Sequence, residues 1–192
     1  MSIPHKTRCH WPGERPHDII YHDEEWGVPV HDDRKLFEFL LLDAFQAGLS
    51  WTTILKKREN FREAFDNFDA KKISEYGDEK IKDLLNDKGI IRNRLKIHSA
   101  ISNAKLFLNI QKEFGSFDNY IWQFTEGETI VNIRKEMADI PVSTIESDAM
   151  SKDLKKRGFK FVGTTICYAF MQAAGMVNDH TVDCFRYLEV GK

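Results

Sequence analysis

The chain has 192 residues, 42% of them hydrophobic, which is enough for a full hydrophobic core in one domain or two closely joined lobes. No apolar run is long enough to span a bilayer and no charged-then-apolar N-terminal signal is visible, so neither a membrane protein nor a secreted one is expected. Three cysteines argue against a disulfide framework and favour a reducing cytoplasm, and the formal net charge of -2 neither requires nor excludes nucleic acid.

The spacing of apolar residues predicts an almost entirely helical chain. Between Pro29 and Pro141 there is no proline, and apolar residues recur at intervals of three and four. Asp32 or Asp33 is expected to cap a helix that ends near Ala47. Further helices are expected at residues 51–65 after a Ser50 cap, 79–87 after an Asp78 cap, 92–114, 117–124, 147–157 and 164–174. The predicted fold class is all-α.

Residues 79–105 predict a helix–hairpin–helix motif, with a tight connection at Gly89 before a long helix that buries Leu95. The free backbone N–H groups at the start of such a second helix bind phosphate. Arg92, Arg94 and Lys96 would add positive charge there, and a second basic segment lies at residues 150–165. An ordinary helical corner explains the hairpin segment equally well, and solvated helix faces explain the basic segments.

Thiol and imidazole side chains lie near both ends of the chain. Cys9 and His22 are separated by a loop that contains proline and glycine. His180 and Cys184 are four residues apart, so on a helix they would share one face. Two thiolates and two imidazoles form a closed tetrahedral zinc set, which would join the chain ends. Alternatively, these are ordinary thiols and surface histidines, or His22 is replaced by His10, His17 or His31.

An acid and several aromatic residues suggest a pocket. Asp43 lies on a strongly apolar helix, where a carboxylate is costly unless it has a partner or a role. With Tyr21, Trp26 and Trp51 it would form an aromatic pocket that suits a planar, electron-poor base. Leu49 lies on the following inter-helix loop, where an apolar tip could wedge into a base stack. Core packing is the simpler explanation for any one of these aromatic residues taken alone.

Four long segments of the chain are distinctive: YHDEEWGVP (21–29), DAFQAGLSWTTILKKRENFREAF (43–65), KGIIRNRLKI (88–97) and KKRGFKFVGTTICYAFMQAAGMVNDH (155–180). They resemble the 3-methyladenine DNA glycosylase I family, and the resemblance covers nearly the whole chain in the same order. It implies an all-helical helix–hairpin–helix glycosylase that flips a nucleotide out of alkylated DNA and hydrolyses the N-glycosidic bond of 3-methyladenine.

The resemblance also implies roles for individual residues. Tyr21, Trp26 and Trp51 would line the base pocket. Asp43, which stands where the family usually has glutamate, would accept hydrogen bonds from the base and discriminate against unmodified adenine. Leu49 with Gly48 would fill the gap in the base stack. The phosphates would be held by the hairpin, through Gly89, Arg92 and Arg94, and by the stretch from Lys156 to Thr165, which includes Gly163 and Thr164.

One structural zinc ion is implied as well, with Cys9, His22, His180 and Cys184 as its ligands. No water-activating base is assigned, and Asp179 is expected to orient His180. We expect a single unit over residues 1–192, with a helical core at about 30–145, the hairpin near 79–105, and a zinc-stapled lobe formed by 1–29 and 146–192.

The expected partners are double-stranded alkylated DNA and the released 3-methyladenine, with no membrane, and the protein is expected to be a cytoplasmic monomer. Because Asp43 is one methylene shorter than glutamate, two alternatives stay open. One is a non-catalytic binder of damaged or abasic DNA, and the other is an enzyme with shifted alkyl-base specificity. A zinc hydrolase would require an open position on the metal.

Overall fold

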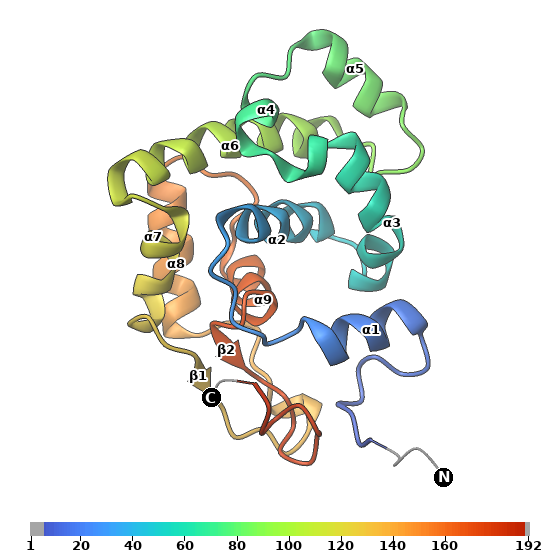
Figure 1. Cartoon of the computed structure of the whole chain (residues 1–192), viewed down its shortest axis with the longest axis vertical. Coiled ribbons are helices and arrows are strands. Elements are labelled where there is room, and N and C mark those ends of the chain that lie inside the picture. The colour runs from blue at the N-terminus through green and yellow to red at the C-terminus, as the bar shows by residue number, and fades with distance from the viewer. Residues whose placement is uncertain (1–5, 191–192) are drawn as a thin grey trace.

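The structure is a computed structural model that describes residues 6–190, so the outermost parts of the predicted zinc-stapled lobe, residues 1–5 and 191–192, lie outside it. Helices dominate the described chain (Figure 1). They are α1 (Pro16–Glu24), α2 (Asp33–Gln46), α3 (Trp51–Ala64), α4 (Ala70–Ser74), α5 (Asp78–Asn86), α6 (Arg94–Phe114), α7 (Phe117–Ile121), α8 (Ile145–Lys156) and α9 (Thr164–Ala173). Short 3₁₀ turns lie at Asp66–Phe68, Trp122–Thr125 and Met137–Asp139. The all-α prediction is confirmed.

Local sequence accounts for most helix boundaries. Asp32 and Ser50 cap α2 and α3 as predicted, by accepting hydrogen bonds from backbone N–H groups in the first turn. The prediction that Asp78 caps α5 was wrong, because Gly77 is the N-cap and Asp78 is the first helical residue. The sequence pattern also missed α1, which begins with Pro16 at its first position and has few apolar residues, and α4.

Helix α2 lies at the centre of the molecule and packs against α3, α6, α7 and α9 (Figure 1). Every residue from Leu36 to Phe45 is buried, so α2 has no solvent face beyond its first turn. By contrast, α6 exposes Leu95, at 72% of its surface, which contradicts the predicted burial of that side chain. Leu95 lies in the first turn of α6 on the side that faces solvent, while the next two residues, Lys96 and Ile97, face the core and are buried.

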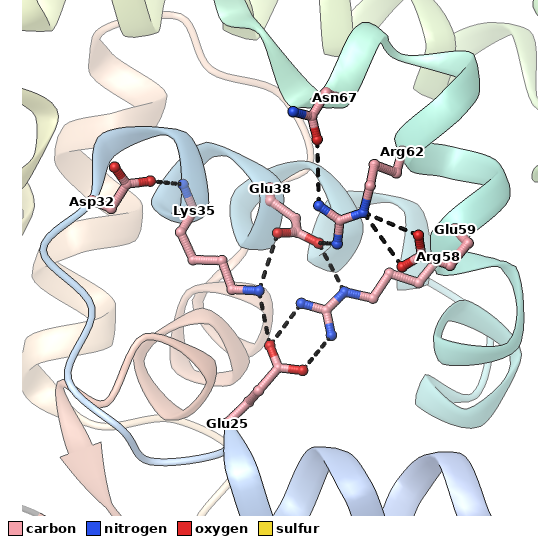
Figure 2. Close-up of polar contacts among 8 residues, drawn as sticks. All are labelled: Glu25, Asp32, Lys35, Glu38, Arg58, Glu59, Arg62 and Asn67. Carbon is pink, nitrogen blue, oxygen red and sulfur yellow. Dashed lines mark hydrogen bonds and ion pairs between the residues drawn. The ribbon is translucent and has the colours of Figure 1, made fainter.

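A buried ion-pair network connects α1, α2 and α3 (Figure 2). The guanidinium of Arg58 donates to Glu38 at 2.8 Å and to both oxygens of Glu25, just after α1, at 2.6 and 2.8 Å. Lys35 bridges the same two carboxylates, at 2.9 and 3.2 Å. Burial raises the pKa of Glu25, but the hydrogen bonds from Arg58 and Lys35 outweigh it and lower that pKa to about 2. The network fixes three helices that each carry a residue of the site described below.

The C-terminal segment returns to the N-terminal one. Strands β1 (Ile130–Val131) and β2 (Val177–Asn178), which were not predicted, form a short parallel pair with Ile130 opposite Val177. Beyond β2, the backbone N–H of Phe185 donates to the carbonyl of Thr7 at 2.9 Å. Within residues 6–190, no helix combines the length and apolar character needed to cross a membrane.

Candidate active site and candidate metal centre

A cavity of about 340 Å³ opens between α1, α2, α3 and α9. The predicted pocket residues Tyr21, Trp26, Asp43 and Trp51 all line it. The remaining lining residues are Trp11, Gln46, Met137, Ile140, Ala169 and Gln172. The volume lies within the usual range for a small-ligand site, and the lining is mostly aromatic and apolar. The structure therefore brings the predicted residues together, while their roles stay predictions.

The aromatic side chains that line the cavity pack against one another. The ring centroids of Tyr21 and Trp51 are 5.3 Å apart, and Trp11 meets the ring of Trp26 edge-on at 5.3 Å. Asp18 fastens α1 to the start of α3, because its buried carboxylate accepts a hydrogen bond from Thr52 at 3.0 Å. Trp51, the residue before Thr52, is thereby fixed at the edge of the cavity.

Three polar atoms in this cavity are buried without a hydrogen-bond partner anywhere in the described chain. They are Oδ2 of Asp43 and the indole Nε1 atoms of Trp11 and Trp51. Buried polar groups are normally paired, so three unpaired ones on residues that line the same cavity indicate a place for a polar ligand. A flat heterocycle with hydrogen-bond acceptors for the indoles and a donor for the acid would satisfy all three.

Burial changes the acid–base behaviour of the pocket. Asp43 is 2% exposed, and burial raises the pKa of its carboxyl well above the usual value. Burial, reinforced by the nearby Asp43, likewise raises the pKa of Tyr21. A positive charge brought into the cavity would favour the ionised carboxylate and lower its pKa. The site is thus electrostatically suited to a cationic ligand over a neutral one of the same shape.

Trp11 and Gln172 were not singled out from the sequence. Trp11 lies two residues after Cys9, and that spacing could have indicated it, since a metal at Cys9 fixes the local backbone. Gln172 carries no comparable signal. The amide of Gln172 donates to Asp179 at 2.8 Å, which holds its side chain at the cavity wall.

The candidate metal centre lies beside this pocket. Cys9, His22 and Cys184 place their ligand atoms within 4.8 Å of one another, all buried. Cys184 Sγ lies 3.5 Å from Nε2 of His22. The rings of His22 and His180 are 5.1 Å apart, and Nε2 of His180 is buried with no partner among residues 6–190. His10, His17 and His31 are exposed, so His22 is the N-terminal imidazole of this cluster.

Outer partners leave both Nε2 atoms available to a metal. Nδ1 of His22 faces Asp23 at 2.8 Å, and Nδ1 of His180 faces Asn178 at 3.0 Å. Asp179 was expected to orient His180, which is wrong. Its carboxylate instead accepts hydrogen bonds from Arg134, Tyr168 and other donors. His180 and Cys184 do not share a helix face either, since residues 180–184 form a bridge and a turn.

The protonation states suit metal binding. Burial and the neighbouring His22 lower the pKa of His180 to about 3, so this imidazole is neutral at pH 7. A hydrogen bond from Cys9 and another with His22 outweigh burial and lower the pKa of Cys184, while the hydrogen bond to Cys184 and burial raise the pKa of Cys9. Neutral imidazole and thiolate are the forms that bind metal, so the four residues fit a zinc ion whose binding would release the proton of Cys9.

The residues predicted to bind DNA lie mostly at the surface. Leu49 is 41% exposed, at the tip of the loop between α2 and α3. Arg92 and Arg94 are exposed around the start of α6, and Lys156 is exposed at the end of α8. Of the remaining residues, Gly48 adjoins Leu49, Gly89 lies in the connection before α6, Gly163 is the N-cap of α9, and Thr164 and Thr165 begin that helix.

Lys96 differs from the other basic residues of this segment. It was expected to add charge for phosphate, but it is 6% exposed and its ammonium donates to the backbone carbonyls of Phe45 and Ala47. Its ammonium group therefore binds backbone carbonyls inside the protein, at the end of α2, and does not face solvent.

Comparisons with known proteins identify the family of this chain. A family model described as methyladenine glycosylase matches residues 11–187. The chain is 51% identical to DNA-3-methyladenine glycosylase 1 of Escherichia coli over 180 residues, covering 94% of this chain and 96% of that one. A crystal structure of a 3-methyladenine DNA glycosylase I superposes with a TM-score of 0.91 at 51% identity, covering 93% and 98% of the two chains.

A more distant solved structure, of the Staphylococcus aureus 3-methyladenine DNA glycosylase I, concerns recognition of 3-methyladenine. It is 34% identical with a TM-score of 0.90, over 93% of this chain and 95% of that one. The fold and the pocket together define an all-α DNA glycosylase. More narrowly, the chain belongs to the methyladenine glycosylase family.

Proposed function

We propose that this protein is a DNA repair enzyme that excises 3-methyladenine from alkylated double-stranded DNA by hydrolysing its N-glycosidic bond. Membership of the family supports the reaction, and the observation that carries it is the aromatic cavity in which Asp43 Oδ2 and two indole N–H groups lack partners. Free 3-methyladenine and an abasic site are the products. We place the enzyme in the cytoplasm, as a monomer.

Charge explains how such a pocket would select its base. Methylation at N3 makes the adenine ring cationic while it is still bonded to the sugar, so the base is already a good leaving group. Stacking on Tyr21, Trp26 and Trp51 adds cation–π attraction that a neutral adenine lacks. The cation also favours the carboxylate of Asp43, which accepts a hydrogen bond from the base. Unmodified adenine would meet a neutral acid and a weaker stack.

The exposure of Leu49 and of the basic side chains Arg92 and Arg94 supports a binding mode for the duplex. In this proposal, Leu49 with Gly48 fills the gap left by the flipped nucleotide. Arg92 and Arg94 contact phosphates on one side together with the backbone around Gly89. Lys156 and the start of α9, through Gly163, Thr164 and Thr165, contact them on the other. Helix N-termini favour phosphate because their N–H groups and dipole point at it.

We further propose that Cys9, His22, His180 and Cys184 hold one structural zinc ion. Two thiolates and two imidazoles would close a tetrahedral site and leave no position for substrate, so the ion would stabilise the fold rather than react. It would join the terminal segments 1–29 and 146–192 into one lobe beside the helical core. His22 follows Tyr21 directly, so the metal would also fix the approach of that ring to the pocket.

The test is chromatography of the free bases released when the purified protein is incubated with methylated duplex DNA. Release of 3-methyladenine, with 7-methylguanine left in place, is the expected result. Release of a different alkylated base would preserve the class and revise the pocket. No release from a protein that still binds abasic DNA would overturn the proposal in favour of the non-catalytic binder, which the replacement of glutamate by Asp43 makes the second candidate.

A further inference from the structure

The loop that carries Leu49 is a tight turn with a defined backbone geometry. Gln46 is the last residue of α2, and its carbonyl accepts the N–H of Leu49 at 2.6 Å. Between them, Ala47 has φ -43° and ψ 115°, and Gly48 has φ +80°. These angles are those of a type II β-turn, which requires positive φ at its third residue and therefore favours glycine there. The direction of Leu49 depends on this turn.

The buried side chain of Lys96, on the neighbouring helix α6, forms hydrogen bonds with that turn. Its ammonium donates to the carbonyl of Phe45 at 2.8 Å and to the carbonyl of Ala47 at 2.6 Å. The last carbonyls of a helix lack partners within the helix and carry partial negative charge, so a buried cation satisfies them. Burial lowers the pKa of Lys96, which has no carboxylate partner among its hydrogen bonds in the described chain.

The hydrogen bond from Lys96 to the Ala47 carbonyl depends on the type of the turn. In a type II turn the carbonyl of the second residue points to the opposite side from that in a type I turn, because the central peptide is rotated by about half a revolution. A donor fixed on the Ala47 carbonyl therefore selects one turn type. Lys96 lies on α6, which follows the hairpin, so the hairpin helix determines how the Leu49 tip is presented.

A second lysine, Lys57, forms hydrogen bonds with the connection between α5 and α6. Lys57 on α3 donates to the carbonyls of Lys88 and Gly89, in the connection before α6, at 2.9 and 3.0 Å. Lys96 thus links α6 to the end of α2 and the following loop, and Lys57 links α3 to the connection between α5 and α6, in both cases through an ammonium group on backbone carbonyls. The two surfaces proposed to contact DNA form one unit.

We propose that Lys96 is a positioning residue, which holds the Leu49 turn in the geometry that inserts into the base stack and makes no contact with phosphate. This inference rests on the proposed function, in particular on the wedge role of Leu49. If it holds, loss of the ammonium weakens binding to a flipped or abasic site through Leu49 alone. A lysine that contacted phosphate would instead weaken binding to every duplex.

The experiment is a double-mutant cycle of Lys96→Met and Leu49→Ala, measured as affinity for a duplex with one abasic-site analogue over a range of salt concentrations. Lys96→Met is expected to weaken binding by roughly ten-fold, the usual scale for a lost hydrogen bond to a charged group. In the Leu49→Ala background it is expected to change affinity by less than about two-fold. The salt dependence should equal that of the wild type.

Equal losses in both backgrounds would overturn the proposal, since Lys96 would then act independently of Leu49. A salt slope reduced by about 0.9 would also overturn it, because one phosphate contact would have been lost. Lys112→Met, an exposed lysine near the far end of α6, is the matched control and should change neither quantity. If Lys96→Met loses its helical circular dichroism, Lys96→Gln, which is uncharged and shorter than lysine, enters the same cycle with the same criteria.

The proposed function has separate readouts. A wild-type protein that releases no 3-methyladenine refutes the enzyme, and a Leu49→Ala variant with unchanged affinity for the abasic duplex refutes the wedge. Neither result is produced by an error about Lys96 alone.

Discussion

The burial of Asp43 makes a quantitative prediction about stability and pH. The folded protein holds this carboxyl 2% exposed, with Oδ2 unpaired in the described chain, and burial raises its pKa well above the usual value. An unfolded aspartate titrates near pH 3.9. Between these two pKa values the folded state keeps a proton that the unfolded state has lost. The contribution of Asp43 to stability is therefore highest at low pH and decreases as the pH rises.

The magnitude follows from proton linkage. One proton of difference changes the free energy of unfolding by about 1.4 kcal/mol per pH unit. Asp43→Asn cannot ionise, so its free energy of unfolding relative to the wild type should rise by that amount per unit from about pH 4 up to the folded-state pKa. Total stabilities of about 5–15 kcal/mol make such a slope large. It corresponds to a urea midpoint shift of roughly half a molar or more per pH unit.

The assay is urea unfolding of both proteins at several pH values between 5 and 8 with zinc present. The difference between the two curves cancels the titration of all other groups. Asp83→Asn, at an exposed position on α5, is the matched control for the same change of side chain at the surface. A pH-independent difference for Asp43→Asn would refute the reasoning, since it would mean that the buried carboxyl is already ionised in the folded protein.

Other predictions address the site and the fold. Asp43→Ala should abolish selective base release, measured by chromatography, while binding to an abasic duplex stays within about two-fold of wild type; joint loss of both would contradict a recognition role. Metal analysis after dialysis should find one zinc ion per chain, and His180→Ala should retain less; a wild type without metal would dismiss the zinc site. Arg58→Met should lower the free energy of unfolding by about 3–5 kcal/mol, because it leaves Glu38 and Glu25 without their main partner. Arg62→Met, at a side chain 35% exposed, should cost about 1 kcal/mol or less in the same urea titration, and equal costs would argue against the buried network.

The helical fold was predictable because its signals are local. Intervals of three and four between apolar residues, and caps such as Asp32 and Ser50, act within one or two turns of chain. The family was recognisable from long segments of sequence, and the comparisons confirm it. Tyr21, Trp26, Trp51 and Asp43 were grouped as a pocket from their residue types and positions, and the resemblance then implied their roles. For any one aromatic residue taken alone, core packing was the simpler explanation.

Other features depended on contacts between distant parts of the chain. Lys96 and Arg94 are both basic residues of one helical turn, yet Arg94 is exposed and Lys96 is buried against carbonyls that lie 49 and 51 residues earlier. Asn178, and not the adjacent Asp179, orients His180, because the path of the chain after β2 turns the Asp179 carboxylate toward Arg134. The sequence determined which residues carry charge and which segments form helices. Only tertiary structure decided which atoms each side chain meets, because a hydrogen bond depends on separations of a few ångströms that spacing along the chain does not encode.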